Sequence, residues 1–261
     1  MVLDSWEYED VNAIYAYTKY DKPISLRGTS QDSLVVLREE GDDGDIRARL
    51  VLSGFQSSPD TITGTWEQVD GTKALSVELH RNFSLDYEER VGWEERRYIL
   101  QGATLGDWYF MLGVAKEKDK SFVQTRSVRI REQKSDSLIQ TVDVDGQLLG
   151  LESIEVKDYS FDGHEDFSVF ERSYAGPNVS RLYFLYNSET GTFQKKDLPG
   201  TSLTFLPEKE VFRSRNQSQA GCMITVSKYT FREMDVQLLE ESCYVCNDEG
   251  ERVEREMGAC E

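Results

Sequence analysis

Short stretches of alternating apolar and polar residues follow one another along almost the whole chain of 261 residues. Four clear examples are SLVVLRE at 33–39, ARLVLSG at 48–54, LIQTVDV at 138–144 and RLYFLYN at 181–187. An alternation of period two is typical of a β-strand that buries one face. Turn signals such as Asp145-Gly146 and Thr190-Gly191 separate the stretches, because glycine supplies the positive φ that tight connections need. The chain is therefore predicted to be all-β.

About eighteen strands of this kind exceed what one β-sandwich holds. We expect a single β-propeller-like domain over residues 1–261, with about five blades of four short antiparallel strands. The alternative is two packed barrel or sandwich domains, at residues 1–134 and 135–261, the second holding the cysteines and the metal motif described below. A propeller should repeat every 40 to 50 residues or so, and the sequence shows only a weak echo of such a repeat.

Acidic residues outnumber basic ones by 48 to 30, which gives a formal net charge of −18 at pH 7. This charge argues against nucleic acid as a partner and favours encounter with a basic protein. The motifs Gly-x-Ser-x-Gly, Gly-x-x-x-x-Gly-Lys and His-Glu-x-x-His do not occur, and the chain has two histidines. We therefore expect a protein that is not an enzyme. No apolar run is long enough for a transmembrane segment.

The four cysteines, Cys222, Cys243, Cys246 and Cys260, all lie near the end of the sequence. They can form two disulfides in three ways. A hairpin that turns at residues 231–234 would place Cys222 opposite Cys243 and leave Cys246 for Cys260. A zinc site is the alternative, but only Cys243 and Cys246 have the close spacing of a zinc-binding pair. We favour disulfides, and hence an oxidising compartment.

The segment DYSFDGHED at residues 158–166 concentrates potential metal ligands. Side-chain oxygens stand at positions 1, 3, 5 and 9 of the segment, and a backbone carbonyl is available at position 7, which suits the hard oxygen shell of calcium. Gly163 fits the chain reversal at position 6. Three carboxylates this close repel one another unless a cation lies among them. We predict a Ca²⁺ ion bound by Asp158, Ser160, Asp162, the carbonyl of His164, and Asp166.

This motif departs from the helix-loop-helix calcium site at position 12, where Val169 replaces the bidentate glutamate. Predicted strands flank the motif, so we expect a calcium loop between two strands that Asp166 closes. Serine at position 3 would weaken the site relative to Asn or Asp. The alternative is an Asp-rich turn held by hydrogen bonds from the backbone to the carboxylates.

Three segments around the motif resemble a family of bacterial periplasmic proteins and lipoproteins, and the cysteine-rich end at 222–260 is similar to it as well. The three segments are LIQTVDVDGQ at 138–147, VKDYSFDGHEDFSVF at 156–170 and SYAGPNVSRLYFLYNSETGTFQ at 173–194. The resemblance implies a calcium-binding, β-propeller-like immunity protein. Such proteins occlude the active-site cleft of lysozyme-like peptidoglycan hydrolases that bacteria inject into rivals through secretion systems. It implies a periplasmic location and allows a lipid anchor to the envelope.

The segment SYAGPN at 173–178 is the candidate for insertion into such a cleft. Alanine and glycine make it narrow and proline limits its flexibility, so that little entropy is lost on docking. The candidate contact residues are Ser173, Tyr174, Gly176 and Asn178, and we expect Tyr174 and Asn178 to hydrogen-bond catalytic carboxylates. An ordinary hairpin loop is the structural alternative. The functional alternative is a calcium-dependent binder of cell-wall carbohydrate without an inhibitory role.

Overall fold

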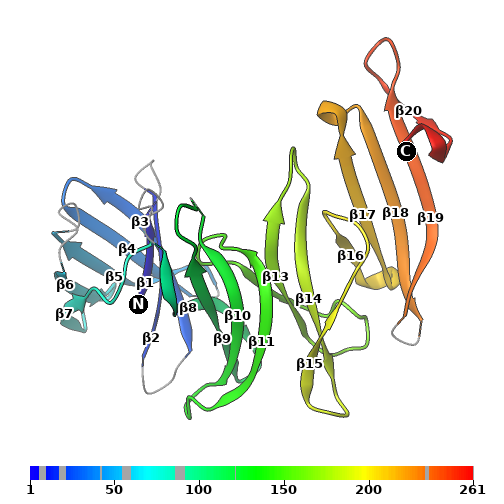
Figure 1. Cartoon of the computed structure of the whole chain (residues 1–261). Coiled ribbons are helices and arrows are strands. Elements are labelled where there is room, and N and C mark those ends of the chain that lie inside the picture. The colour runs from blue at the N-terminus through cyan, green and yellow to red at the C-terminus, as the bar shows by residue number, and fades with distance from the viewer. Residues whose placement is uncertain are drawn as a thin grey trace. The chain divides into compact units, whose positions relative to one another are not determined.

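The computed structural model describes residues 1–5, 10–17, 22–41, 43–54, 60–85, 92–120, 122–232 and 235–260. Strands make up nearly all of the regular structure in these residues, with a few short 3-10 turns, so the all-β class is confirmed (Figure 1). Within the same residues, no helix has both the length and the apolar character needed to cross a membrane.

The chain forms two compact units, one of residues 1–144 and 148–153 and the other of residues 145–147 and 154–261. Each unit contains two sheets in which every strand pairs with its neighbours in sequence. The sheets have seven, four, four and five strands, rather than the predicted five sets of four. The difference arises because the first seven strands continue from hairpin to hairpin as one sheet. The chain passes between the units at β11 and the segment after it, not between residues 134 and 135.

The first unit contains eleven strands among its described residues. They are β1 (Val2–Ser5), β2 (Asp10–Ala16), β3 (Pro23–Gln31), β4 (Leu34–Glu40), β5 (Ile46–Ser53), β6 (Thr61–Gln68), β7 (Ala74–His80), β8 (Trp93–Leu105), β9 (Trp108–Lys116), β10 (Gln124–Glu132) and β11 (Leu138–Gln147), whose last residues belong to the second unit.

The sheet of β1–β7 buries one face, as the period-two alternation predicts. Val11, Leu26, Leu37 and Leu52 of four neighbouring strands are at most 2% exposed and form its core. Glycine is required where β3 approaches β4, because a Cβ at Gly28 would lie 1.8 Å from the carbonyl oxygen of the neighbouring strand. The alternation of the sequence and the burial of the strands therefore agree here.

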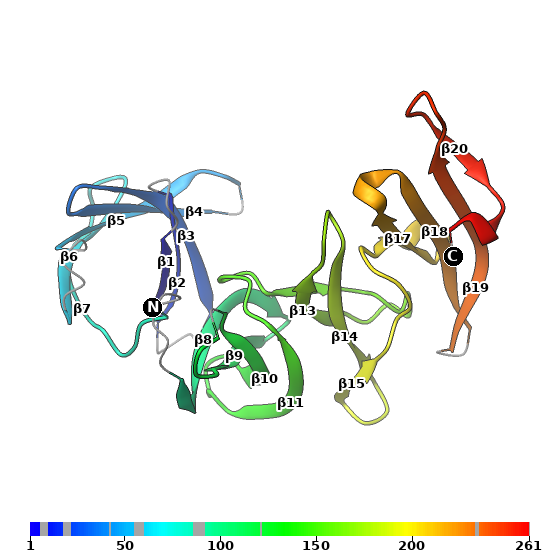
Figure 2. The same cartoon turned by 45° about the horizontal axis from the view of Figure 1, so that its top comes forward.

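The sheet of β8–β11 is curled, as Figure 2 shows. Register shifts in β8 and β10 add unpaired residues, and such bulges increase the local bend and twist of a strand. The central strand β9 is buried along most of its length, so side chains on both of its faces are covered. Its sequence accordingly lacks a clean apolar and polar alternation.

The second unit contains two further meander sheets. The first comprises β12 (Ile154–Lys157), β13 (Asp166–Ser173), β14 (Val179–Asn187) and β15 (Thr192–Lys196), and the second comprises β16 (Thr204–Leu206), β17 (Val211–Ser218), β18 (Met223–Arg232), β19 (Asp235–Cys246) and β20 (Arg252–Arg255). Tyr159, Tyr183 and Leu185 are buried against half-buried side chains that include Phe205 and Phe231. Aromatic packing thus joins the two sheets of this unit.

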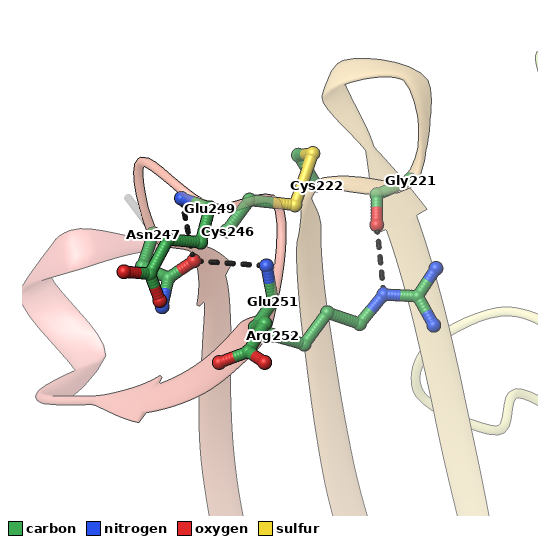
Figure 3. Close-up of a disulfide and its surroundings, with 7 residues drawn as sticks. All are labelled: Gly221, Cys222, Cys246, Asn247, Glu249, Glu251 and Arg252. Carbon is green, nitrogen blue, oxygen red and sulfur yellow. Dashed lines mark hydrogen bonds between the residues drawn. A yellow bond between two sulfur atoms is a disulfide. The ribbon is translucent and has the colours of Figure 1, made fainter.

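Two disulfides are confirmed, but the predicted pairing is wrong. Cys222 is bonded to Cys246, and Cys243 is bonded to Cys260. Figure 3 shows the first of these bonds, which joins the start of β18 to the end of β19. With every cysteine in a disulfide, no thiolate is left for the zinc alternative. Two disulfides are typical of proteins from oxidising compartments.

Strand register explains the change of partner. Arg232 pairs with Asp235, two residues further along β19 than a hairpin centred on 231–234 requires; residues 233–234 themselves lie outside the described residues. Leu239 is an extra residue in β19, because Lys228 pairs with Glu240 whereas the next residue pairs with Leu238. The two shifts move Cys243 away from Cys222 and bring Cys246 opposite it.

Candidate functional site

The predicted metal motif forms the connection between β12 and β13 in the second unit. Asp166 lies at its end as the first residue of β13 and is 0% exposed. One carboxylate oxygen accepts hydrogen bonds from the backbone N–H groups of Tyr159 (2.9 Å) and Ser160 (3.1 Å). The other accepts from the N–H of Tyr186 on β14, at 2.8 Å. A single buried carboxylate therefore fixes the loop to two strands.

Burial has the largest effect on the pKa of the Asp166 carboxyl group. Desolvation raises the pKa of Asp166 to about 6, although the three N–H donors act in the opposite direction. The charged form of Asp166 is consequently less favourable in the folded protein than in water, and a cation nearby would counteract that effect.

The other two aspartates of the motif also accept hydrogen bonds from the loop backbone. The carboxylate of Asp158 accepts from the N–H groups of Phe161 (2.7 Å) and Gly163 (2.9 Å). The carboxylate of Asp162 accepts from the N–H of His164 at 2.8 Å. This pattern is that of the Asp-rich turn considered as the alternative. Gly163 has φ +86°, as the predicted chain reversal requires.

The donor chemistry of the loop suits calcium, because carboxylate oxygens that accept one hydrogen bond keep further lone pairs. The placement of the side chains is less favourable: within the described residues, no three or more Asp, Glu, His or Cys side chains are grouped so that they could hold a metal ion. Ser160 is buried and its hydroxyl lies 3.5 Å from a carboxylate oxygen of Asp158. Calcium binding at this loop therefore stays a prediction.

Calcium at millimolar concentration is expected to raise the melting temperature of the wild-type chain, because an ion that binds only the folded state stabilises it by mass action. Asp162→Ala removes an exposed side chain with a single backbone partner, so it should fold and show no response to calcium. The measurement is a thermal melt of both proteins in calcium and in chelator. Wild-type curves that coincide under the two conditions would remove the calcium site.

Phe161 is a residue of the loop that the sequence pattern did not single out. Its φ of +63° lies in the left-handed region that non-glycine residues rarely adopt. Its ring centroid lies 6.2 Å from those of Phe205 on β16 and Phe231 on β18. These aromatic contacts offset the backbone strain and hold the loop against the second sheet of the unit.

The predicted partner-binding segment connects β13 to β14, at the other end of β13 from the metal motif. Eight residues of β13 separate the two, a distance on the order of 25 Å at the usual rise of a strand. Residues 173–177, which we call the tip, are all exposed, and Tyr174 is 46% exposed. The backbone N–H of Tyr174 donates to the carbonyl of Asn178 at 2.9 Å and closes the tip.

Asn178 was predicted as an exposed contact residue, but its side chain is buried. It is 6% exposed, and its amide group bonds to the backbone of Gln217 on β17 through two hydrogen bonds, of 2.6 and 2.9 Å. It also donates to the carbonyl of Ala175 at 3.3 Å. The side chain of Asn178 is therefore directed into the protein, while Ser173, Tyr174 and Gly176 remain available at the surface.

A second side chain supports the base of the tip. The hydroxyl of Ser202 donates to the carbonyl of Pro177 (3.2 Å) and accepts from the N–H of Val179 (3.1 Å). Neither Ser202 nor Gln217 could be recognised from the sequence, because each is a common polar residue distant in the chain from the segment it supports. A tip held at its base from two directions differs from an ordinary mobile hairpin loop.

The similarity of this chain to known proteins supports no argument about its fold or function. No protein-family model matches the chain, and no curated protein matches its sequence. Among solved structures, a Xanthomonas protein described as related to a type IV secretion system matches 97% of this chain and 97% of its own, with 12% identity and a TM-score of 0.29. A TM-score this low supports no inference about the function or the sites of the present chain.

Proposed function

We propose that this chain is a periplasmic immunity protein that binds a lysozyme-like peptidoglycan hydrolase and occludes its active-site cleft with the tip. The observation that carries the proposal is the tip itself: five exposed residues, narrow and supported at the base, that present Tyr174 to solvent. The resemblance of the surrounding segments to periplasmic inhibitors names the class of partner.

The physical advantage of such a tip is entropic. A loop that is already ordered loses little conformational freedom when it docks. Tyrosine suits the contact because its ring provides apolar area with two side-chain torsions, and its hydroxyl can hydrogen-bond a carboxylate in the cleft. Because Ala175 and Gly176 are small, the tip is narrow enough to enter a substrate groove.

Charge supports a basic partner. The net charge of −18 accelerates association with a positively charged protein, and enzymes that act on the anionic cell wall are commonly basic. Added salt should therefore slow the association rate more than it speeds dissociation. The proposed reaction of the chain is binding alone, without catalysis.

Location outside the cytoplasm is supported by the two disulfides, which persist in oxidising compartments such as the bacterial periplasm. The periplasm is also where peptidoglycan hydrolases reach their substrate, so inhibitor and target would meet there. Calcium in the 158–166 loop is part of the proposal as a structural ion, remote from the tip.

Because immunity proteins are normally encoded beside their targets, we expect the hydrolase to be encoded beside this chain. Tyr174→Ala is expected to weaken inhibition of that hydrolase by about thirtyfold or more, since a central tyrosine of an interface commonly contributes about 2 kcal/mol or more. The matched control is Tyr17→Ala, which removes a tyrosine of similar exposure (43%) from the first unit. The assay is release of fragments from purified peptidoglycan at increasing inhibitor concentration.

Equal inhibition by both variants would remove the tip from the mechanism. Absence of any complex between the wild-type chain and the hydrolase at micromolar concentration would contradict the proposed function as a whole. Binding of the isolated chain to peptidoglycan only when calcium is present would instead favour the carbohydrate-binding alternative.

A further inference from the structure

We infer that Asn178 is a positioning residue, which sets the direction of Tyr174 by fixing the tip to β17, the strand that pairs with the disulfide-bonded hairpin of β18 and β19. The inference rests on the proposed function, because it assigns to the tip a defined orientation toward a partner. It differs from the expectation that Asn178 touches the partner itself.

The bonds of Asn178 connect two different sheets. Its side-chain amide donates to the carbonyl of Gln217 and its side-chain oxygen accepts from the N–H of the same residue. One asparagine thereby satisfies both backbone groups of a residue in β17, as a neighbouring strand would. The tip belongs to the β12–β15 sheet, and these two hydrogen bonds, together with those of Ser202, hold it from outside its own hairpin.

Gln217, to which Asn178 bonds, is itself held in place by its neighbours. Gln217 pairs with Ile224 in the β17–β18 ladder, and its side-chain oxygen accepts from a guanidinium N–H of Arg215 at 2.8 Å. Immediately after β17 comes the short 3-10 turn η3 (Gln219–Gly221), followed by the disulfide Cys222–Cys246.

Figure 3 shows that η3 is also held by β20: the side chain of Arg252 donates to the carbonyl of Gly221 at 3.1 Å. The N–H of Cys246 donates to the carbonyl of Cys222 at 2.9 Å beside the disulfide. The covalent link and these bonds leave the end of β17 little freedom to move. Asn178 transmits that rigidity to the tip.

Asn187 provides a matched control at the opposite end of the same strand. It is the last residue of β14, and its side-chain oxygen accepts from the N–H groups of Glu189 (2.9 Å) and Thr190 (3.1 Å). It therefore makes a similar number of bonds to backbone, but within its own turn and remote from the tip.

The test is site-resolved hydrogen exchange of Asn178→Ala and Asn187→Ala in the full chain, without any partner. Asn178→Ala should accelerate exchange of the Tyr174 N–H, which donates to the carbonyl of Asn178, by about tenfold or more, while residues 189–191 keep their wild-type rates. Asn187→Ala should show the reverse. Unchanged tip rates in Asn178→Ala, or equal acceleration throughout the unit, would overturn the inference.

A second readout separates positioning from mere stability. In inhibition of the hydrolase encoded beside this chain, Asn178→Ala should weaken binding in the wild-type background and add nothing in the Tyr174→Ala background, since both changes act through one side chain. Fully additive losses would contradict the inference. If the hydrolase is not bound at all, the proposed function fails, whereas the exchange test still decides the role of Asn178.

Ser202→Ala tests the same inference if Asn178→Ala does not fold. It removes a half-buried hydroxyl that bonds to Pro177 and Val179 at the base of the same tip. It should produce the same local acceleration at the tip, several-fold in size and without a change at 189–191. Wild-type exchange at the tip in this variant would count against a tip held from outside its hairpin.

Discussion

Asp166→Ala should destabilise the second unit by about 3 kcal/mol or more, because a fully buried carboxylate that accepts from three backbone N–H groups is removed, and each lost hydrogen bond at such a position costs about 1–3 kcal/mol. All four tryptophans, at positions 6, 66, 93 and 108, belong to the first unit. Urea unfolding followed by tyrosine signals should therefore shift, while tryptophan fluorescence should not. Asp197→Ala, which removes a side chain that is 91% exposed, is the control and should change neither.

The contribution of Asp166 to the free energy of unfolding should decrease as the pH rises. With a pKa of about 6 in the folded state against an ordinary value of 3.8, the folded protein binds more protons between these values than the unfolded chain. The stability that Asp166 contributes is thus fully present below about pH 4 and is lost as the pH rises through 6. Measured in chelator, the stability difference between wild type and Asp166→Asn should be larger at pH 4 than at pH 7.5; a difference that grows with pH would contradict this account.

Removing either disulfide is expected to cost about 3 kcal/mol, since the bonds close loops of 24 and 17 residues and thereby restrict the unfolded chain. Loss of Cys243–Cys260 should cost more than loss of Cys222–Cys246, because Cys243 is 0% exposed and its replacement by alanine also leaves a cavity. The measurement is thermal unfolding of the two paired Cys→Ala variants in the full chain.

A non-reducing peptide map provides the control for this prediction. It should recover Cys222 with Cys246 and Cys243 with Cys260. A peptide that links Cys222 to Cys243 would show that the β18–β19 register described here is wrong. The same map on the Cys222→Ala/Cys246→Ala variant should retain the second bond, because Cys260 reaches Cys243 from beyond β20 without help from the first.

Local patterns were enough to predict the fold class. Alternation in segments such as 48–54 specifies strands with one buried face, and a connection that contains Thr190-Gly191 keeps consecutive strands adjacent. The turn expected at Asp145-Gly146 is wrong, because both residues lie within β11 and Gly146 does not have a positive φ. The number of strands in each sheet could not be predicted in the same way. Whether a new strand extends a sheet or starts another depends on contacts between residues distant in sequence.

The cysteine pairing shows how small register shifts change a prediction. The pairing of Arg232 with Asp235 shifts the register by two residues and the bulge at Leu239 shifts it by one more, and no turn signal in the sequence predicts that bulge. Leu239 is 52% exposed, so burial did not dictate its place either.

The candidate site was predictable in position and only partly in role. Aspartates at 158, 162 and 166 and the small residues of the tip stand out in the sequence. The asymmetry among the aspartates, with Asp166 buried and Asp162 exposed, results from the packing of β13 against β14. The role of Asn178 depends on Gln217, which lies 39 residues later, so the sequence alone suggested an exposed contact.

Hydrogen exchange of the chain alone and mixed with the hydrolase encoded beside it is the most direct test of inhibition through the tip. The account predicts that protection on binding is strongest at residues 173–176 and that the 158–166 loop, at the other end of β13, keeps its rates. Protection centred on the 158–166 loop, or no protection in the second unit despite inhibition, would contradict it.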